Sequence, residues 1–433
     1  MNISIIGIGY VGLTTAAFLS SLGHKVFCVD KDSKKITQLL KGKMPVYEPG
    51  LEELIHKNRR QLIFTTNLDR AAKESSAVFI TVGTPSKEDG STDLSYIYSV
   101  VDELAGLINK ETLIIVKSTV PPGTTHEVKN RFAENGISPE KIRVAANPEF
   151  LREGSAVNDM FHPDRTIIGL EPDDSRSLAE MKDVYKEYED TFLVTSIPGA
   201  ELIKYASNAF LAAKISFINE IARICDHYDV DIMDVATGMG KDERIGGRFL
   251  HAGLGYGGSC FPKDVSSLCH LAIKHNGSSP ILEAVQQINQ SQVDYFIDKI
   301  QARFPKAANT SLTVWGIAFK PNTDDIRFSQ AVSLIQKLAE KGYKVKCYDP
   351  VAKLPDIPEN VSVLDNKETA VRNSDGLIIA TDWDEFKNLD LGRISRIMKG
   401  NVVFDARNCV DPAKVLQTGM DYIGIGRRLE RKD

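Results

Sequence analysis

The sequence predicts an α/β protein in which two doubly wound parallel sheets are joined by a central region of long helices. Short apolar runs alternate with helix-like segments in the first third of the chain, and the same alternation returns in the last third. The stretch between them carries apolar residues at helical spacing. Alternating strands and helices are typical of doubly wound sheets. We therefore expect domains over residues 1–196, 197–305 and 306–433.

Length and composition agree with this division. The 433 residues exceed the size at which a single core stops growing, ~250–300 residues. Hydrophobic residues make up 42% and charged residues 26%, with a net charge of −5 and scattered basic residues, which argues against a nucleic-acid partner. The six cysteines form no metal-binding pattern, so we expect no metal and a reducing, cytoplasmic setting. Glycines interrupt the uncharged N-terminal run, so we expect no membrane segment.

The first strand-like run, Ile3 to Ile6, leads directly into a glycine motif. Gly7, Gly9 and Gly12 form G-x-G-x-x-G around Val11, and residues at helical spacing follow. Strand, glycine motif and helix in this order are the context of the dinucleotide-binding, Rossmann-type fingerprint. The glycines allow a tight turn, a close approach of pyrophosphate and close packing of helix on strand.

A second expected strand, Lys25 to Val29, ends in Asp30. An acid at this place binds ribose hydroxyls and favours NAD over NADP, because it repels a 2′-phosphate. Lys35 lies about one turn into the next helix. It either meets the cofactor or is a solvated helix lysine.

Three later strands of this domain are expected to end in functional loops. Thr84 follows the strand at 77–82, and Thr119 follows the strand at 112–116. Ligands bind at the carboxyl ends of strands in an open parallel sheet, so both loops should face the cofactor, although turn chemistry alone explains their prolines and glycines. The third strand precedes Asn147–Gly154, whose carboxylates and arginine we interpret as site residues rather than surface charges.

The central region predicts two long helices. The first can start at Pro198 with Glu201 in its first turn, and apolar residues then recur at spacings of three and four. Lys204 and Asn208 lie four apart beside this apolar face. Lys204 is either an ordinary snorkelling lysine or, with Asn208, part of a unit that stabilises an oxyanion. With a second helix over 280–304, this region is expected to connect the domains and form a dimer.

A glycine-rich loop, Gly255–Asp264, carries Cys260. The other five cysteines lie in strand-like or helix-like runs or directly after a strand, where a structural role is expected. A thiol becomes a nucleophile when a nearby cation or a helix N-terminus stabilises its thiolate. Lys263 and a helix starting near Asp264 could supply both.

The last third predicts a second α/β domain with strands near 312–316, 344–349, 376–380 and 401–405. No G-x-G-x-x-G follows its first strand, so we expect no second dinucleotide there. Lys320, Arg327 and Arg407 follow strands or open loops. Each alone is an ordinary surface cation, but together they suit a phosphate-bearing substrate.

These motifs, in this order, resemble the UDP-glucose/GDP-mannose dehydrogenase family, and within it the UDP-glucose branch. The resemblance covers essentially the whole chain. It rests on the glycine fingerprint with Asp30, Ser118–Gly123, Asn147–Gly154, Lys204 with Asn208, Gly255–Asp264, and Lys320 with Arg327.

The resemblance implies an NAD-linked oxidation of a sugar C6 alcohol to a carboxylate with two NAD per UDP-glucose. Cys260 would capture the aldehyde as a thiohemiacetal, and a second oxidation would give a thioester that water hydrolyses. Lys204 and Asn208 would hold the oxyanion, Asp264 would assist proton transfers, and Glu149 with Thr119 would serve hydrolysis. A homodimer is expected from the family.

The resemblance also implies binding residues. The expected NAD contacts are Gly7, Gly9, Val11, Gly12, Asp30, Lys35, Thr84, Thr119, Glu153, Lys263 and Arg327. The expected sugar-nucleotide contacts are Glu149, Phe150, Leu151, Arg152, Glu153, Lys204, Asn208, Arg244, Phe249, Leu250, His251, Ala252, Gly253, Gly257, Phe261, Lys320 and Arg407. Some family members carry a lysine where this chain has His251.

Three alternatives remain open from the sequence. The same chemistry could act on GDP-mannose or a UDP-N-acetylhexosamine. A two-electron β-hydroxyacid dehydrogenase resembles the first two-thirds of the architecture but leaves Cys260 and the second α/β domain without a use. A non-catalytic NAD-binding redox sensor would use Cys260 as its switch and leave Lys204, Asn208 and Glu149 unexplained.

Overall fold

The computed structural model describes residues 1–429, so residues 430–433 of the expected C-terminal domain lie outside it. The chain divides into two compact units, and each is described by itself. The first unit holds residues 1–207 and 266–275, and the second holds the described remainder. Helices α9 (Ile197–Tyr228) and α11 (Phe261–Lys274) run from one unit into the other.

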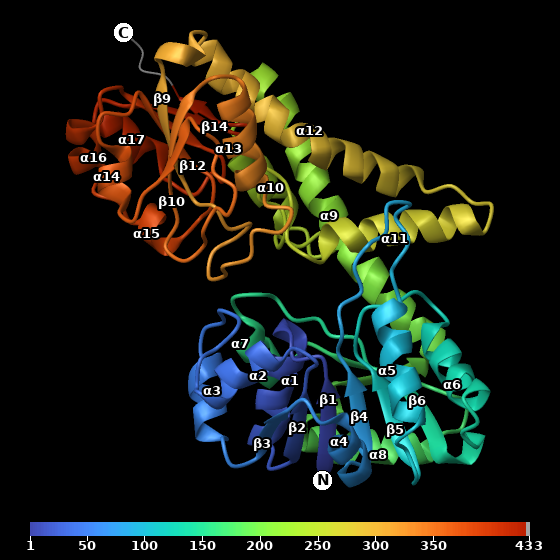
Figure 1. Cartoon of the computed structure of the whole chain (residues 1–433). Coiled ribbons are helices and arrows are strands. Elements are labelled where there is room, and N and C mark those ends of the chain that lie inside the picture. Colours follow the sequence, from blue (N-terminus) through green and yellow to red (C-terminus); the bar gives the residue numbers. More distant parts are fainter. Residues whose placement is uncertain (430–433) are drawn as a thin grey trace. The chain divides into compact units, whose positions relative to one another are not determined.

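The first unit is built on an eight-stranded sheet in the order β3-β2-β1-β4-β5-β6-β7-β8 (Figure 1). All neighbouring strands pair in parallel except β6 and β7. The strands are β1 (Asn2–Ile6), β2 (Lys25–Val29), β3 (Leu62–Thr65), β4 (Ala77–Ile80), β5 (Thr112–Val116), β6 (Ile142–Ala146), β7 (Thr166–Leu170) and β8 (Phe192–Ser196).

Helices cover both faces of this sheet, and two apolar clusters fill the space between the layers. The helices of the unit are α1 (Tyr10–Ser21), α2 (Ser33–Leu40), α3 (Leu51–Lys57), α4 (Leu68–Glu74), α5 (Ser95–Ala105), α6 (Thr124–Glu134), α7 (Ala156–Phe161) and α8 (Ser175–Tyr185), with 3₁₀ turns at η1 (Pro139–Lys141) and η2 (Lys186–Thr191). Strands β1, β2, β4 and β5 are mostly apolar because both of their faces are buried.

The second unit holds a seven-stranded sheet in the order β11-β10-β9-β12-β13-β14-β15. Only the β14–β15 pair is antiparallel among the named strands. The strands are β9 (Ser311–Trp315), β10 (Lys344–Tyr348), β11 (Val361–Val363), β12 (Gly376–Ile379), β13 (Val402–Asp405), β14 (Asp421–Gly424) and β15 (Arg428–Leu429). The sequence therefore correctly predicted two parallel-sheet regions with long helices between them.

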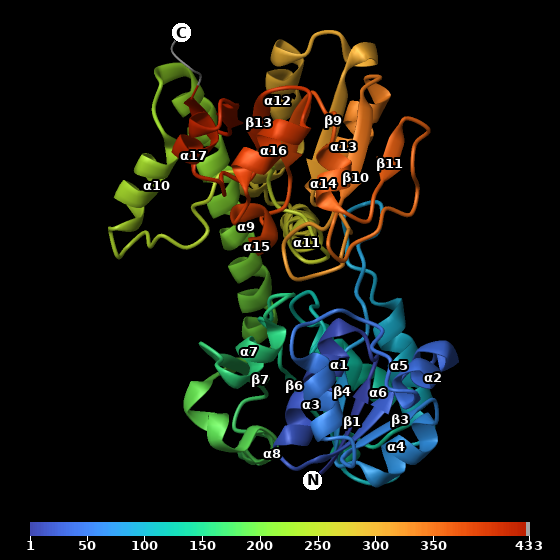
Figure 2. The ribbon, with the colours of Figure 1, turned by 90° about the vertical axis from the view of Figure 1, so that its left-hand side faces the viewer.

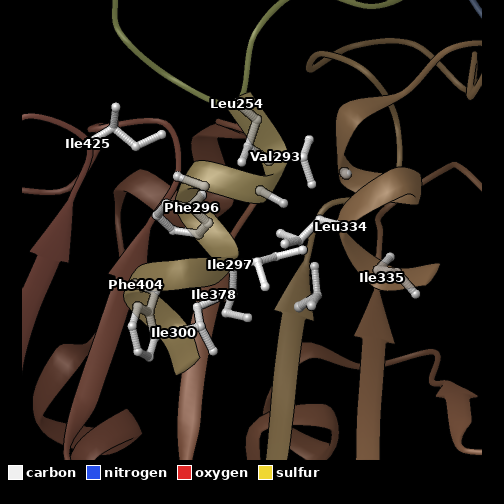
Figure 3. Packing of buried hydrophobic residues seen from close by; sticks show 14 of the residues in the cluster. Leu254, Val293, Phe296, Ile297, Ile300, Leu334, Ile335, Ile378, Phe404 and Ile425 are labelled. Atoms are coloured by element: carbon white, nitrogen blue, oxygen red, sulfur yellow. The ribbon is translucent and has the colours of Figure 1, made fainter. Parts of the chain in front are cut away.

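The two faces of this second sheet carry different helices (Figure 2). One face packs against the long helices, and Figure 3 shows Phe296, Ile297 and Ile300 of α12 beside Ile378 and Phe404 of the sheet. The other face packs against short helices around Trp315. The remaining helices of the unit are α10 (Ile232–Gly240), α12 (Pro280–Arg303), α13 (Gln330–Glu340), α14 (Lys367–Val371), α15 (Asp384–Lys387), α16 (Leu391–Ile397) and α17 (Pro412–Gln417), with a 3₁₀ turn at η3 (Ala307–Asn309).

Two helix starts differ from the prediction. Helix α9 begins at Ile197 with no acid in its first turn, so Glu201 lies beyond that turn. Glu201 is buried, and its carboxylate accepts hydrogen bonds from Gly123 N and Thr125 N at 2.6 and 2.8 Å. Helix α11 begins at Phe261 rather than near Asp264, because Pro262 fits a first helical turn, where no N–H is needed.

Candidate active site

The glycine fingerprint forms the turn between β1 and α1, and each glycine has a separate reason. Gly7 has a φ of +95°, and a Cβ there would lie 2.9 Å from Val82. A Cβ on Gly12 would lie 2.0 Å from the carbonyl oxygen of Gly7. A Cβ on Gly9 would meet no atom within 4 Å, which leaves open space beside the backbone. The turn thus has the shape that admits a pyrophosphate at the N-terminus of α1.

Asp30 ends β2 and ties the fingerprint to the second strand. Its carboxylate accepts Ile8 N at 2.9 Å and Asp32 N at 3.0 Å. Lys35 Nζ lies 2.7 Å from Asp30 Oδ2, so the two residues that were predicted to contact NAD form an ion pair. The open space at Gly9 and this acid at the end of β2 both fit an NAD.

The loops after β4 and β5 meet at the carboxyl ends of their strands. Thr84 is buried and its hydroxyl donates to the Thr119 carbonyl at 2.8 Å. Ser118 Oγ donates to Val82 O at 2.7 Å. The structure therefore brings together the two loops that sequence position alone placed on one edge of the sheet.

A buried ion pair joins the loop after β6 to helix α9. Lys204 Nζ lies 3.1 Å from Glu149 Oε1, and both side chains are less than a tenth exposed. Burial alone would raise the pKa of Glu149, but the Lys204 ammonium, the Leu151 N–H and the Lys117 ammonium hold it below its usual range. Lys204 also lies 5.1 Å from the centre of the Phe150 ring.

The rest of this loop is fixed by contacts that the sequence did not reveal. Arg152 is exposed, and its side chain pairs with Asp159 at 2.5 Å. Glu48, on the loop before α3, accepts Gly154 N at 2.7 Å and also the hydroxyl of Tyr10. Glu48 is buried, so it fastens the segment beside Glu153 to the fingerprint turn. Its partners lie too far away in sequence for any local pattern to indicate them.

In the second unit, the glycine-rich loop packs too closely for side chains. A Cβ on Gly257 would lie 2.3 Å from the carbonyl oxygen of Phe328, and one on Gly258 would lie 2.7 Å from the Phe319 ring. Gly258 N donates to the Arg327 carbonyl at 2.9 Å. These contacts hold the Cys260 loop against the segment that carries Lys320 and Arg327.

Cys260 directly precedes the first residue of α11. Its thiol is partly exposed and lies 3.6 Å from Ser259 Oγ. The four cysteines expected in the core, Cys28, Cys225, Cys269 and Cys347, are all buried. A helix N-terminus stabilises negative charge, so this position favours a thiolate.

Asp264 lies in the first turn of α11 and is fully buried. Its carboxylate accepts Asn208 Nδ2 at 2.6 Å and contacts the Lys263 ammonium. Asn208 is itself buried, so the amide is held in one orientation beside the helix that follows Cys260.

The expected sugar-nucleotide segment 249–253 contains both buried and exposed side chains. Leu250 and Ala252 are buried in the core, so only their backbone is available to a ligand, whereas His251 is exposed. Phe249 has a φ of +65°, and its ring lies 6.4 Å from that of Phe261. The buried amide of Asn219 accepts the N–H of Gly253 at 2.8 Å.

The cations of the second unit have different settings. Arg407 donates to Ala380 O and Phe319 O, both at 2.8 Å, and burial lowers its pKa. Lys320 Nζ lies 5.4 Å from the centre of the Phe319 ring. The exposed Arg327 and Arg244 pair with Asp325 and Asp242 at 2.7 and 2.6 Å. The geometry ties the Phe319 segment to Arg407 and leaves Arg244 on the surface.

The expected site residues belong to both units. Those in the first unit are Gly7, Gly9, Val11, Gly12, Asp30, Lys35, Thr84, Thr119, Glu149 to Glu153 and Lys204, and those in the second are Asn208, Arg244, Phe249 to Gly253, Gly257, Cys260, Phe261, Lys263, Asp264, Lys320, Arg327 and Arg407. Within residues 1–429, no group of three or more His, Cys, Asp or Glu side chains could hold a metal ion. None of the helices over that range is long and apolar enough to span a membrane.

Three family models cover most of the chain in order. The NAD binding domain of the UDP-glucose/GDP-mannose dehydrogenase family matches residues 1–189, its central domain matches 199–291, and its UDP binding domain matches 313–412. The chain belongs to this family. Its first domain is therefore an NAD binding domain and its last a UDP binding domain.

Full-length relatives agree with this assignment. The Bacillus subtilis protein YtcA is 47% identical over 428 residues, which are 99% of this chain and 100% of the relative. UDP-glucose 6-dehydrogenase YwqF of the same organism is 41% identical over 99% of this chain and 98% of its own length. A UDP-glucose dehydrogenase structure from Pyrobaculum islandicum superposes with a TM-score of 0.89 at 36% identity, covering 98% of this chain and 97% of that one.

Proposed function

We propose that this protein is an NAD-dependent UDP-glucose 6-dehydrogenase, which oxidises UDP-glucose to UDP-glucuronate. The observation that carries the proposal is Cys260 at the N-terminus of α11, beside the buried Asn208–Asp264 pair. Transfer of one hydride needs no thiol, whereas carrying an alcohol through to an acid can use one. The full-length similarity to UDP-glucose dehydrogenases supports this substrate rather than another nucleotide sugar.

Bound NAD supplies the hydride acceptor for each of the two oxidations. Between them, the Cys260 thiolate adds to the C6 aldehyde to form a thiohemiacetal, and the second oxidation converts this thiohemiacetal to a thioester. Lys204 and Asn208 stabilise the oxyanion that develops on the sugar oxygen. The helix N-terminus at Phe261 stabilises negative charge on the Cys260 sulfur, and Asp264 assists the proton transfers.

Hydrolysis of the thioester releases the carboxylate and restores the thiol. Glu149, held ionised by Lys204, accepts a proton from the attacking water, and Thr119 acts beside it. The remaining expected NAD and sugar-nucleotide contacts keep the binding roles that the family resemblance implies.

The test is the ratio of NADH formed to UDP-glucose consumed, measured for the wild type and for Cys260→Ser. We expect two NADH per sugar in the wild type and a serine variant that stalls before the acid is released. No NADH from UDP-glucose would contradict the substrate and point to GDP-mannose or a UDP-N-acetylhexosamine. One NADH per sugar, unaffected by the substitution, would contradict the thioester route.

We also propose a homodimer formed through α9 and a cytoplasmic location. Six free cysteines suit a reducing compartment. The apolar face predicted for α9 is open in the second unit, where Phe210, Phe217 and Ile224 are 67%, 46% and 49% exposed. These residues follow one another at intervals of seven, so they form one stripe along the helix. A second copy of the same stripe supplies a complementary apolar surface about a two-fold axis.

Sedimentation of Phe217→Asp tests the dimer. We expect the wild type to sediment as a dimer and the variant as a folded monomer, because a buried charge without a partner is costly. Ile273→Asp is the control, since Ile273 is 63% exposed and lies on α11. A dimer that survives Phe217→Asp, or one that Ile273→Asp disrupts equally, would rule out this interface.

A further inference from the structure

Lys117 is a buried lysine that the catalytic scheme does not use. It follows β5 directly, in the segment that leads to Thr119, and is only 4% exposed. Lysine is almost never fully buried unless its ammonium has partners, because removing the charge from water is costly. The burial of the Lys117 ammonium at the carboxyl end of β5 therefore needs an explanation.

Neutral oxygens surround the Lys117 ammonium at hydrogen-bond distance. It lies 3.1 Å from Asn147 Oδ1, 3.5 Å from the Asn147 carbonyl and 3.3 Å from the Tyr185 hydroxyl. Tyr185 donates to Asn147 Oδ1 at 2.5 Å, and burial raises the pKa of Tyr185, so the phenol stays protonated. Among the residues that the structure describes, no carboxylate forms an ion pair with Lys117.

Asn147 fixes this arrangement relative to the catalytic loop. It is 1% exposed, its backbone N–H donates to Val116 O, and its side-chain amide donates to Ile167 O, both at 2.9 Å. Glu149 follows two residues later. The Lys117 ammonium is thus bonded to Asn147, at the start of the loop that carries the Glu149 carboxylate.

We propose that Lys117 is a positioning residue for thioester hydrolysis: its ammonium, anchored by Asn147 and Tyr185, keeps the Glu149 carboxylate ionised and paired with Lys204. The proposal rests on the proposed function of Glu149 and goes beyond it. It assigns the ionisation of Glu149 to two buried cations, of which only Lys204 contacts the carboxylate.

The charged groups that act on this carboxylate support the proposal. Lys204 on α9 contacts the Glu149 carboxylate, the Lys117 ammonium after β5 acts on it electrostatically, and both favour its ionised form. The same interaction works in reverse: burial lowers the pKa of Lys117 to about 8, while Glu149 raises it and Lys204 lowers it. Tyr185 on α8 carries no charge at neutral pH. The Glu149 carboxylate therefore offsets part of the cost of burying the Lys117 charge.

Removing the Lys117 charge should raise the pKa of Glu149, because only the Lys204 ammonium would then oppose the effect of burial on this carboxyl. A higher pKa means that Glu149 is protonated at a higher pH, and protonated Glu149 cannot accept a proton from water. For Lys117→Gln we expect the acid limb of kcat to move upward by about one pH unit. Because the pKa of Glu149 lies below its ordinary value in the wild type, hydrolysis should slow by up to several-fold near pH 4.5 and match the wild type near pH 7, while the preceding burst of NADH stays intact.

The experiment is a pH profile of steady-state kcat and burst amplitude for the full-length enzyme with saturating NAD and UDP-glucose. Lys25→Gln is the matched control, because it removes the same charge at the start of β2, far along the strand from Asp30. We expect its acid limb to coincide with that of the wild type. A Lys117→Gln enzyme with a lowered melting temperature but an unmoved acid limb would reduce Lys117 to a structural residue and overturn the proposal.

Two further variants separate this proposal from its premise. Glu149→Gln should retain the burst and lose hydrolysis; if it does not, the proposed role of Glu149 fails whatever Lys117 does. If Lys117→Gln fails to fold, Asn147→Asp replaces it, because a carboxylate at Asn147 Oδ1 would neutralise the ammonium and keep the lysine. We expect the same upward displacement, and an acid limb at the wild-type pH would overturn the proposal.

Discussion

The two sheets of this protein begin in the same way and then diverge. In each, the first strand ends in a glycine with positive φ, +95° at Gly7 and +100° at Gly316. In each, a threonine after the neighbouring strand closes on this turn, since Thr81 donates to Gly7 O at 2.8 Å and Thr381 donates to Ala318 O at 2.7 Å. The shared strand order therefore extends to the polar contacts of the turn.

The similarity continues below the turn. Ser4 on β1 bonds to Ala71 O and to the Ser75 hydroxyl at 3.1 and 2.7 Å. Thr313 on β9 bonds to Ala370 O and to the Ser374 hydroxyl at 2.7 and 2.6 Å. In both sheets a buried hydroxyl of the first strand thus fastens the helix that precedes the neighbouring strand.

The two turns differ in the segment that comes after the glycine. After Gly7 the helix begins at Tyr10, so backbone N–H groups of its first turn are available to phosphates. After Gly316 the next helix begins only at Gln330, and the intervening loop carries Lys320 and Arg327. One turn thus presents a helix N-terminus, in the NAD binding domain, and the other is followed by Lys320, an expected sugar-nucleotide contact, in the UDP binding domain.

The acid at the end of the second strand shows the same contrast. Asp30 accepts Ile8 N at 2.9 Å and pairs with Lys35. Asp349 accepts Ile317 N and Ala318 N at 2.7 and 3.1 Å, and the Trp383 indole N–H at 3.3 Å. Asp349 therefore anchors the backbone of the loop that follows Gly316.

Alanine at the two matched glycines should have the largest effect. A Cβ at Gly7 would lie 2.9 Å from Val82 N, and one at Gly316 would lie 2.5 Å from Thr381 N. Overpacking and unfavourable φ together should destabilise each variant by roughly 2–4 kcal/mol. We expect NAD to raise the melting temperature of Gly316→Ala as it does for the wild type, but not that of Gly7→Ala.

Gly9→Ala is the control for this pair. A Cβ at Gly9 meets no atom within 4 Å, so folding stability should change by less than about 0.5 kcal/mol while NAD binding weakens. An NAD response that Gly316→Ala also loses would mean that the two turns do not have separate ligands.

Asparagine at the two matched acids should have an intermediate effect. Asp30→Asn removes the charge that is predicted to bind the ribose hydroxyls, so the Kd for NAD should rise roughly tenfold, equivalent to about 1.4 kcal/mol. Asp349→Asn should leave NAD binding unchanged, destabilise the second unit by about 1–3 kcal/mol and weaken UDP binding, because the Lys320 loop loses its anchor. Calorimetric titration with NAD and with UDP measures both effects. If both variants weakened binding of the same ligand, the assignment of NAD to the first sheet and UDP to the second would be wrong.

Much of this comparison could be predicted from the sequence. The fingerprint, Asp30 and the absence of a second fingerprint depend on residues close together in the chain, and alternating apolar runs placed strands such as β5 and β10 correctly. Strands β3, β7 and β8 were not predicted, and β8 lies at the sheet edge with residues that are partly or largely exposed. The domain boundaries stay a prediction.

The missed site residues depend on distant partners. Glu48 is hydrogen-bonded to Tyr10 and Gly154, and Lys117 is hydrogen-bonded to Asn147 and Tyr185. No periodicity links such residues, so only the folded chain shows that these polar groups share a buried place. Similarly, the apolar stripe on α9 was predictable as a pattern, but its exposure in the single chain was not.

The smallest expected effect is on the pH dependence of the free energy of unfolding. It concerns one buried carboxylate in each unit. Glu201 accepts two backbone N–H groups and the Thr125 hydroxyl, and Asp405 accepts Val410 N, Arg407 N and the Tyr422 hydroxyl. Burial raises the pKa of both. Glu149 differs, because burial is outweighed by its cations and its pKa falls.

These directions fix opposite pH dependences of the free energy of unfolding. A carboxyl whose pKa is raised by folding holds its proton more tightly in the folded state, so its contribution falls as pH rises from the unfolded pKa through the folded one. The stability advantage of the wild type over Glu201→Gln or Asp405→Asn should therefore be about 1 kcal/mol larger near pH 4.5 than near pH 7.5, as measured by urea unfolding. For Glu149→Gln the sign reverses, because a lowered pKa contributes stability that is lost as pH falls. Equal signs for Glu149 and Glu201 would show that burial, rather than the paired lysines, dominates at the proposed catalytic carboxylate.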